Sequence, residues 1–153
     1  MSTDSRSVAS RIQEEHESLK STMAAIRAEL ESGVSDADFP DWKLGFIWRL
    51  RDFQSALLKH FDLEEDGGFM QDLVAISPGC AVRVDRLKQE HDEVIPRLNG
   101  LTDQLKVMPA RHGGELDRVI AGVIDLFDML ECHEAAEREL IQDVYFQDIG
   151  VGD

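Results

Sequence analysis

Cysteine is scarce in this sequence, with only Cys80 and Cys132 among 153 residues. Their spacing matches no disulfide or metal-binding pattern, and a chain of this length can bury a sufficient core without a covalent bridge. We therefore predict two reduced thiols rather than a disulfide. Because Cys132 adjoins His133 but faces another direction on a helix, we predict a packed free thiol there rather than a redox partner.

Long apolar runs and basic residues are also lacking. No apolar run approaches the roughly 18 residues of a membrane span, and residues 1–10 hold no apolar segment typical of a secretory signal. We therefore expect a soluble, cytoplasmic protein with no membrane partner, formed by a single domain over residues 1–153. The sequence contains 16 Lys and Arg but 31 Asp and Glu, which gives a net charge of −15. Such a surface repels phosphates, so nucleic-acid binding is excluded as a main role.

Apolar residues recur at alternating steps of four and three, which is typical of amphipathic helices packed nearly antiparallel. Four segments follow this pattern: residues 5–32, about 40 to the break at 67–68, 84 to a stop before 109, and 116–144. Between the second and third, residues 69–76 are apolar enough for a short extra helical turn, and residues 148–153 are expected to form a frayed polar tail. The fold class predicted from this pattern is an all-α helix bundle.

Two matching sets of metal-ligand residues lie on these helices. They are His16, His60 and Glu64 in the first half, and His91, His133 and Glu137 in the second. In each half the spacing HxxxE places two donors on one helix face. His91 follows His16 by 75 residues, while His133 follows His60 by 73, which indicates a weak internal repeat.

All six residues occupy core-facing positions of the predicted helices, with Leu and Val one turn away. We therefore predict that they are buried, and the helical rise of about 1.5 Å per residue places the four imidazoles in one layer of the bundle. An unpaired buried carboxylate costs several kcal/mol. A shared cation satisfies all six groups at once.

The donor count fits two metal ions. Four imidazoles supply two donors to each ion, and two bridging carboxylates supply two more. One shared oxide, hydroxide or water makes five, which leaves an open position on each octahedral ion and indicates a reactive site. Nitrogen and oxygen donors suit iron, manganese, zinc or cobalt, and we favour iron because it can cycle electrons.

Three segments carry a resemblance to a known family: residues 15–19 (EHESL), 59–65 (KHFDLEE) and 133–137 (HEAAE). Together they resemble the hemerythrin-like domain, also called the HHE cation-binding domain, over nearly the whole chain. The resemblance implies an up-down-up-down four-helix bundle around a non-haem di-iron centre, oxo- or hydroxo-bridged, with the four histidines as terminal ligands and the two glutamates as bridges. Ferritin-like di-iron proteins use Glu-x-x-His pairs, and the sequence contains none.

Oxygen-carrying hemerythrins are similar to this chain except at two points, a fifth histidine in an HxxxH pair on the third helix and an Asp after the last histidine. Here Leu87 and Ile95 stand four residues either side of His91. The resemblance therefore implies binding of, or reaction with, dioxygen, peroxide or nitric oxide in stress defence or sensing, rather than bulk oxygen transport. The alternatives are an iron-binding or storage module, or a metal-dependent signalling domain without turnover. Whether the chain is an enzyme stays open at this point.

Several other polar and aromatic residues are expected to have ordinary roles. His112 is predicted to be a solvated loop residue. Glu65 and Asp66 are expected at the surface or a helix end, because they point away from the core-facing stripe. Ordinary packing is expected for Trp42, Trp48 and Tyr145, and solvated charged faces for Asp92, Glu93, Glu134 and Glu139.

Overall fold

The computed structural model of this chain describes residues 2–111 and 113–147, so His112 and the tail at 148–153 lie outside the described residues. The described residues contain helices and no strand. The long helices are α1 (Ser2–Ser32), α2 (Phe39–Glu65), α4 (Ala81–Lys106) and α5 (Gly113–Gln142). Shorter elements are α3 (Phe69–Ile76), the 3-10 turn η1 (Pro78–Cys80) and the π-helical turn η2 (Asp143–Gln147).

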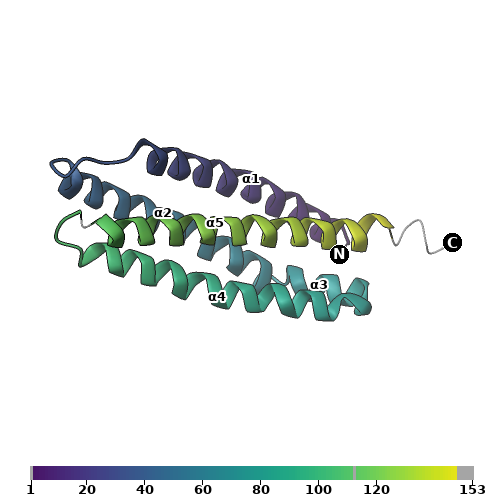
Figure 1. The fold of residues 1–153 in the computed structure, drawn as a ribbon. Coiled ribbons are helices and arrows are strands. Elements are labelled where there is room, and N and C mark those ends of the chain that lie inside the picture. The colour runs from purple at the N-terminus through teal and green to yellow at the C-terminus, as the bar shows by residue number, and fades with distance from the viewer. Residues whose placement is uncertain (1, 112, 148–153) are drawn as a thin grey trace.

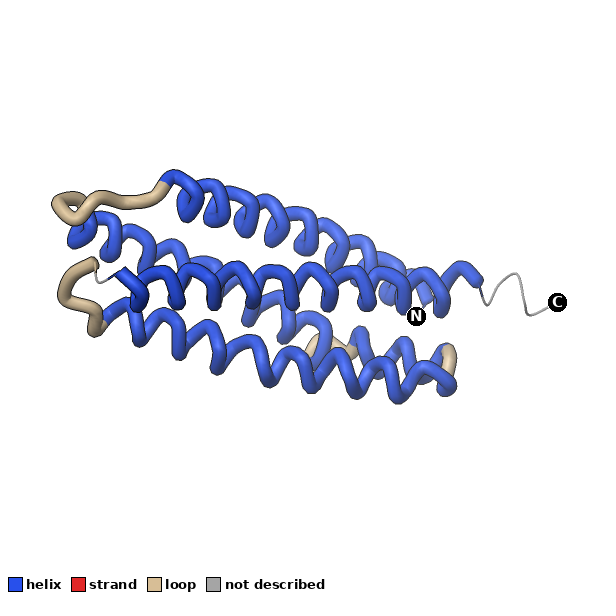
Figure 2. The backbone as a smooth tube through the Cα atoms, in the orientation of Figure 1, coloured by secondary structure: helices blue, strands red, loops and turns tan. Residues whose placement is uncertain are grey.

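The four long helices lie side by side and alternate in direction (Figure 1). The α1–α2 and α4–α5 loops lie at one end of the bundle, and α3 lies at the other end, where it joins α2 to α4 (Figure 2). This arrangement is the predicted up-down-up-down four-helix bundle. The predicted extra turn at 69–76 is also confirmed as α3.

Two glycines make the turn from α2 into α3. A Cβ on Gly67 would lie 2.2 Å from the carbonyl oxygen of Leu63, so no larger residue fits there without a backbone shift. Gly68 has a φ of +82°, a conformation that side chains disfavour, and it directly precedes α3. The break predicted at these glycines is confirmed, and α2 ends at Glu65, directly after the last HxxxE residue.

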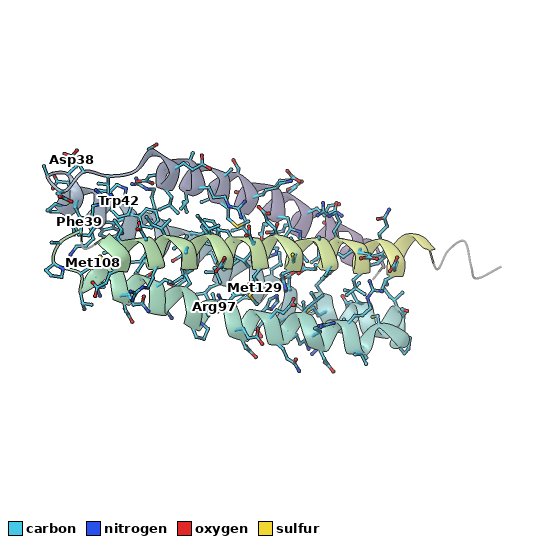
Figure 3. The ribbon with its side chains drawn as sticks, in the orientation of Figure 1. Asp38, Phe39, Trp42, Arg97, Met108 and Met129 are labelled. Carbon is cyan, nitrogen blue, oxygen red and sulfur yellow. The ribbon has the colours of Figure 1, made fainter. Side chains whose placement is uncertain are left out.

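The interior contains two separate apolar clusters. The larger one fills the half of the bundle nearest the two interhelical loops, and includes Leu50, Phe53, Leu98 and Phe127. Phe39 and Trp42 lie at that end of the bundle (Figure 3), where Trp42 stacks on Phe46 with ring centroids 4.8 Å apart. The smaller cluster lies around α3 and includes Ile12, Phe69, Leu73 and Leu140. The core-facing positions between the two clusters hold polar side chains.

Three sequence predictions about single residues are wrong. Trp48 is 64% exposed and is not packed in the core, in contrast to Trp42. Cys132 is exposed, whereas Cys80 is the buried thiol. Glu134 was expected on a solvated face but is only 8% exposed, because α5 turns this side chain toward α1.

In the described residues no helix is long and apolar enough to cross a membrane.

Candidate metal centre

The six predicted ligand residues lie together in one buried layer between the two apolar clusters. Each long helix contributes to it: α1 and α4 supply one histidine each, whereas α2 and α5 each supply a histidine and a glutamate four residues later. Their exposed fractions range from 0% for Glu64 and Glu137 to 8% for His16. The predicted burial and the predicted shared layer are both confirmed.

Each glutamate is shared between two pairs of histidines. Glu64 places Oε2 3.5 Å from the Nε2 of His60, and Oε1 3.2 Å from the Nε2 of His91. Glu137 places Oε1 3.2 Å from the Nε2 of His16, and Oε2 3.2 Å from the Nε2 of His133. One oxygen of each carboxylate thus faces each half of the layer, which is the arrangement needed to bridge two ions.

Two overlapping groups of four side chains could each hold an ion. One consists of His16, His60, Glu64 and Glu137, and the other of Glu64, His91, His133 and Glu137. Within each group the ligand atoms lie within 4.8 Å of one another. Every group contains two imidazole nitrogens and two carboxylate oxygens, a donor set that suits borderline transition metals.

Six polar atoms in this layer are buried and have no hydrogen-bond partner among residues 2–111 and 113–147. They are the Nε2 atoms of His16 and His60 and both carboxylate oxygens of Glu64 and of Glu137. A buried polar atom left unpaired costs about 1–3 kcal/mol, and more where it is charged. Native proteins rarely leave so many unpaired atoms in one place. The layer therefore fits a bound cation, which would satisfy these atoms together.

The outward-facing nitrogens of three histidines contact glutamates from neighbouring helices. The Nδ1 atom of His60 lies 2.8 Å from a carboxylate oxygen of Glu15. The corresponding distances are 2.7 Å from His91 to Glu65 and 2.7 Å from His133 to Glu90. An ionised carboxylate can only accept, so each Nδ1–H donates and each Nε2 keeps its lone pair toward the centre of the layer. This is the tautomer that a metal requires.

Electrostatics favour neutral imidazoles at three of the four positions. Burial lowers the pKa of His60, His91 and His133, in the case of His91 to about 3, although Glu90 opposes the shift at His133. The Nε2 atoms of His91 and His133 lie only 3.1 Å apart, so two lone pairs face each other unless a cation lies beside them. For His16, burial opposes protonation, but contact with Glu137 and its charge raise the pKa overall.

Comparison with known families gives a match to the hemerythrin HHE cation-binding domain over residues 7–145. This chain belongs to that family. No curated protein and no solved structure matched the chain. The described part of this HHE domain contains all six residues of the repeated H…HxxxE pattern, which lie in the layer described above. Its family and its geometry therefore agree on cation binding.

Sequence reasoning missed the glutamates that surround this layer. Glu15, Glu65 and Glu90 each adjoin a predicted ligand in the sequence, and that adjacency was the available signal. Glu65 does lie at the end of α2 as expected, but it contacts His91 rather than only solvent. Burial of Glu65, partial as it is, raises the pKa of its carboxyl group.

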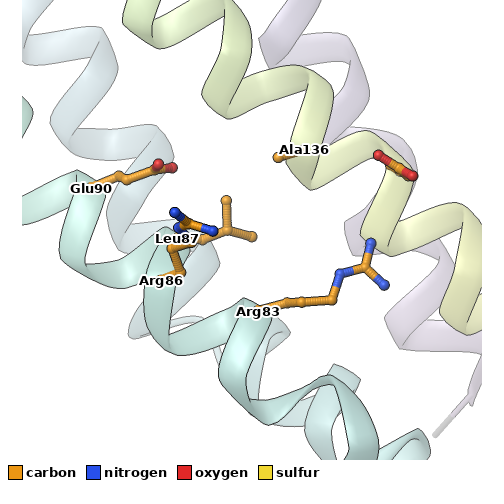
Figure 4. Close-up of a pocket in the computed structure, with 6 residues that line it drawn as sticks. Arg83, Arg86, Leu87, Glu90 and Ala136 are labelled. Carbon is orange, nitrogen blue, oxygen red and sulfur yellow. The ribbon is translucent and has the colours of Figure 1, made fainter.

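A surface hollow lies between α4 and α5 on the α3 side of the HHE layer (Figure 4). Its volume is about 280 Å³, and it is lined by Arg83, Arg86, Leu87, Glu90, Ala136 and Glu139. The Nη1 of Arg83 donates a hydrogen bond to the Oδ2 of Asp143 at 3.0 Å. Glu90 extends from α4 toward α5 (Figure 4). The same Glu90 that contacts His133 therefore forms one wall of the hollow.

Proposed function

We propose that this HHE domain binds two iron ions and uses them to bind or react with dioxygen, peroxide or nitric oxide. The observation that carries the proposal is a set of six buried donor atoms that have no hydrogen-bond partner among the described residues and that two shared carboxylates connect. His16, His60, His91 and His133 would each donate Nε2, while Glu64 and Glu137 would each bridge both ions. Manganese or zinc could fill the same donors, but zinc has no redox chemistry to offer at the open positions.

The protein residues perform three tasks in this proposal. Glu15, Glu65 and Glu90 hold three imidazoles in the tautomer that presents a lone pair inward. The bridging and outer carboxylates offset the charge of two divalent ions, which keeps a highly charged group tolerable in a buried layer. The two apolar clusters exclude bulk water from either side of the layer.

Iron bound here would supply one-electron redox chemistry and open positions for a small diatomic or peroxide ligand. Four histidines and two glutamates give four protein donors per ion, fewer than an octahedral ion accepts. Within residues 2–111 and 113–147 the only histidines are the four of the layer, and residues 87 and 95, one turn either side of His91, are leucine and isoleucine. This is why we propose reaction or sensing rather than reversible oxygen carriage.

The proposal is tested by mixing anaerobic, iron(II)-loaded protein with dioxygen, hydrogen peroxide or nitric oxide, and following both the optical spectrum and the consumption of the ligand. We expect a spectral change with at least one ligand, and none with the His133→Ala variant treated in the same way. Consumption of many equivalents per chain would identify an enzyme, and one equivalent per centre a binding protein. Absence of any spectral change with all three ligands would contradict the proposal.

The same samples separate the two alternatives. A storage module would release both of its irons readily to a chelator and show no ligand consumption. A signalling domain would change its hydrodynamic radius or self-association when metal or ligand binds, again without turnover.

A further inference from the structure

Glu15, Glu65 and Glu90 contact the ligand histidines in a regular pattern around the bundle, and the pattern does not extend to His16. Each adjoins a ligand residue on its own helix and contacts the histidine of another: Glu15 of α1 contacts His60 of α2, Glu65 of α2 contacts His91 of α4, and Glu90 of α4 contacts His133 of α5. The next step around the bundle would run from α5 to His16 of α1. Within residues 2–111 and 113–147, however, the Nδ1 of His16 has no hydrogen-bond partner.

The internal repeat identifies the residue that breaks the pattern. Glu65 directly follows the bridging Glu64, and the residue that directly follows the bridging Glu137 is Arg138. The position that holds His91 with a carboxylate in one half thus carries a cationic side chain in the other. Arg138 lies near His16, because both side chains line the same small hollow between α1 and α5. The two halves of the layer are therefore chemically different despite their matching ligands.

A small hollow opens beside His16, between α1 and α5. It has a volume of about 50 Å³ and is lined by Gln13, His16, Glu17, Lys20, Glu134 and Arg138. A water molecule occupies about 30 Å³ in the liquid, so this space suits a cation with a water rather than an organic ligand. The lining carries two acidic and two basic side chains, which leaves no net positive charge to repel a cation.

Glu134 provides an unpaired carboxylate in this hollow. It is only 8% exposed, and within the described residues it makes no hydrogen bond or ion pair. Its carboxylate lines the same hollow as His16 and Arg138. Glu134 therefore places a carboxylate beside His16, the ligand histidine that lacks an outer hydrogen bond. A cation that moves between solvent and the layer through this hollow would contact that carboxylate first.

We propose that the two metal positions differ, and that the ion between His16 and His60 exchanges with solvent through this hollow by way of Glu134. The inference rests on the proposed two-ion function. Its physical basis is the missing outer hydrogen bond, because removing such a bond from a ligand histidine weakens metal affinity by about 10- to 100-fold. The ion between His91 and His133, whose two imidazoles are both held, exchanges slowly.

The experiment measures iron release from protein loaded anaerobically with two Fe²⁺ ions, after addition of an excess of a chelator that changes colour when it binds iron. Wild-type protein should release one iron in a fast phase and one in a slow phase, with rates that differ by about 10- to 100-fold. Release of both ions in a single phase would overturn the inference. Binding of fewer than two ions would overturn the proposed function as well, so the two failures are distinguishable.

Charge-matched variants separate positioning from electrostatics. Arg138→Glu restores the carboxylate of the repeat and should slow the fast phase about 10-fold or more. Lys20→Glu makes the same charge change in the same hollow, but on α1 itself, and should slow it far less. Equal slowing by both variants would overturn the positioning argument. Both residues are exposed, so neither substitution disturbs the core, and helicity measured by circular dichroism checks this.

Two further variants test the other steps. Glu65→Gln weakens the outer bond to His91 and should convert the slow phase toward the fast one. Glu134→Gln should slow the uptake of one of the two irons by apoprotein while leaving the uptake of the other unchanged. Unchanged uptake of both ions in Glu134→Gln would remove Glu134 from the route.

Discussion

The metal-ligand layer and the apolar cluster around Phe53 and Phe127 are equally well buried, but only one of them is complete. In the apolar cluster each side chain is satisfied by its neighbours, and the rings of Phe53 and Phe127 pack edge to face at 5.3 Å. In the layer, six inward-facing atoms have no hydrogen-bond partner in the part of the chain that the structure describes. The apolar cluster therefore stabilises the fold by itself, whereas the layer gains its stability from what it binds.

This difference explains how one helical pattern serves two purposes. Burial of a large apolar side chain contributes about 1.5–3 kcal/mol, which the two clusters supply many times over. The surplus allows the bundle to fold around a layer whose polar groups oppose folding in the absence of metal. Stability of the scaffold and binding of a cation are thus assigned to separate segments of the same four helices.

The largest expected effect comes from removing a bridge. Glu137→Ala deletes a carboxylate shared by both ligand groups, so metal content should fall from two ions per chain toward zero, as measured by elemental analysis. His133→Ala should also reduce it sharply. Glu139→Ala, an exposed glutamate on the same helix, and His112→Ala are the matched controls and should retain both ions. Equal loss in the controls would mean that the ligand assignment is wrong.

A change in the apolar cluster should act on stability without regard to metal. Phe127→Ala removes a fully buried ring, and the free energy of unfolding should fall by about 3–5 kcal/mol in both metal-free and metal-loaded protein. Denaturant unfolding of both forms measures this. Loss of metal at temperatures where the variant is still folded would show that the cluster and the layer are not separate.

The opposite sign is expected when the layer is made apolar. Glu64→Leu removes two unpaired buried oxygens, so metal-free protein should gain about 1–3 kcal/mol in the free energy of unfolding. The same variant should lose the stabilisation by metal, which for wild type is about 2.7 kcal/mol at a free metal concentration of 100 times Kd. Thermal unfolding with and without metal tests both parts. A metal-free Glu64→Leu protein less stable than wild type would contradict the comparison.

The smallest effect is expected at Cys132. Its thiol is exposed although its neighbour His133 is buried, so it belongs neither to the layer nor to a cluster. Cys132→Ser should retain both metal ions and change the free energy of unfolding by less than about 0.5 kcal/mol. A lost ion in this variant would reveal a role for the thiol that its position does not suggest.

The sequence predicted the features that depend on one helix at a time. The spacing of apolar residues located the four long helices, Gly67 and Gly68 marked the end of α2, and the HxxxE pairs at His60 and His133 identified the buried layer. Each of these is a local property, because side chains three or four residues apart share a helix face.

The features that the sequence did not predict depend on how two helices are rotated against each other. In a four-helix bundle each helix has neighbours on two sides, so a residue turned about 100° from the core-facing stripe can still reach the next helix. Glu65 contacts His91 and Glu134 is buried against α1 for this reason. The same rotation leaves Trp48 and Cys132 exposed. The spacing of residues within one helix does not give the angle by which that helix is rotated against its neighbours.

The central claim is that this layer holds two iron ions, and metal analysis of anaerobically purified protein tests it most directly. The account predicts two irons per chain, together with a new near-ultraviolet absorption band after exposure to air. One zinc per chain, or no metal and no spectral change, would contradict it.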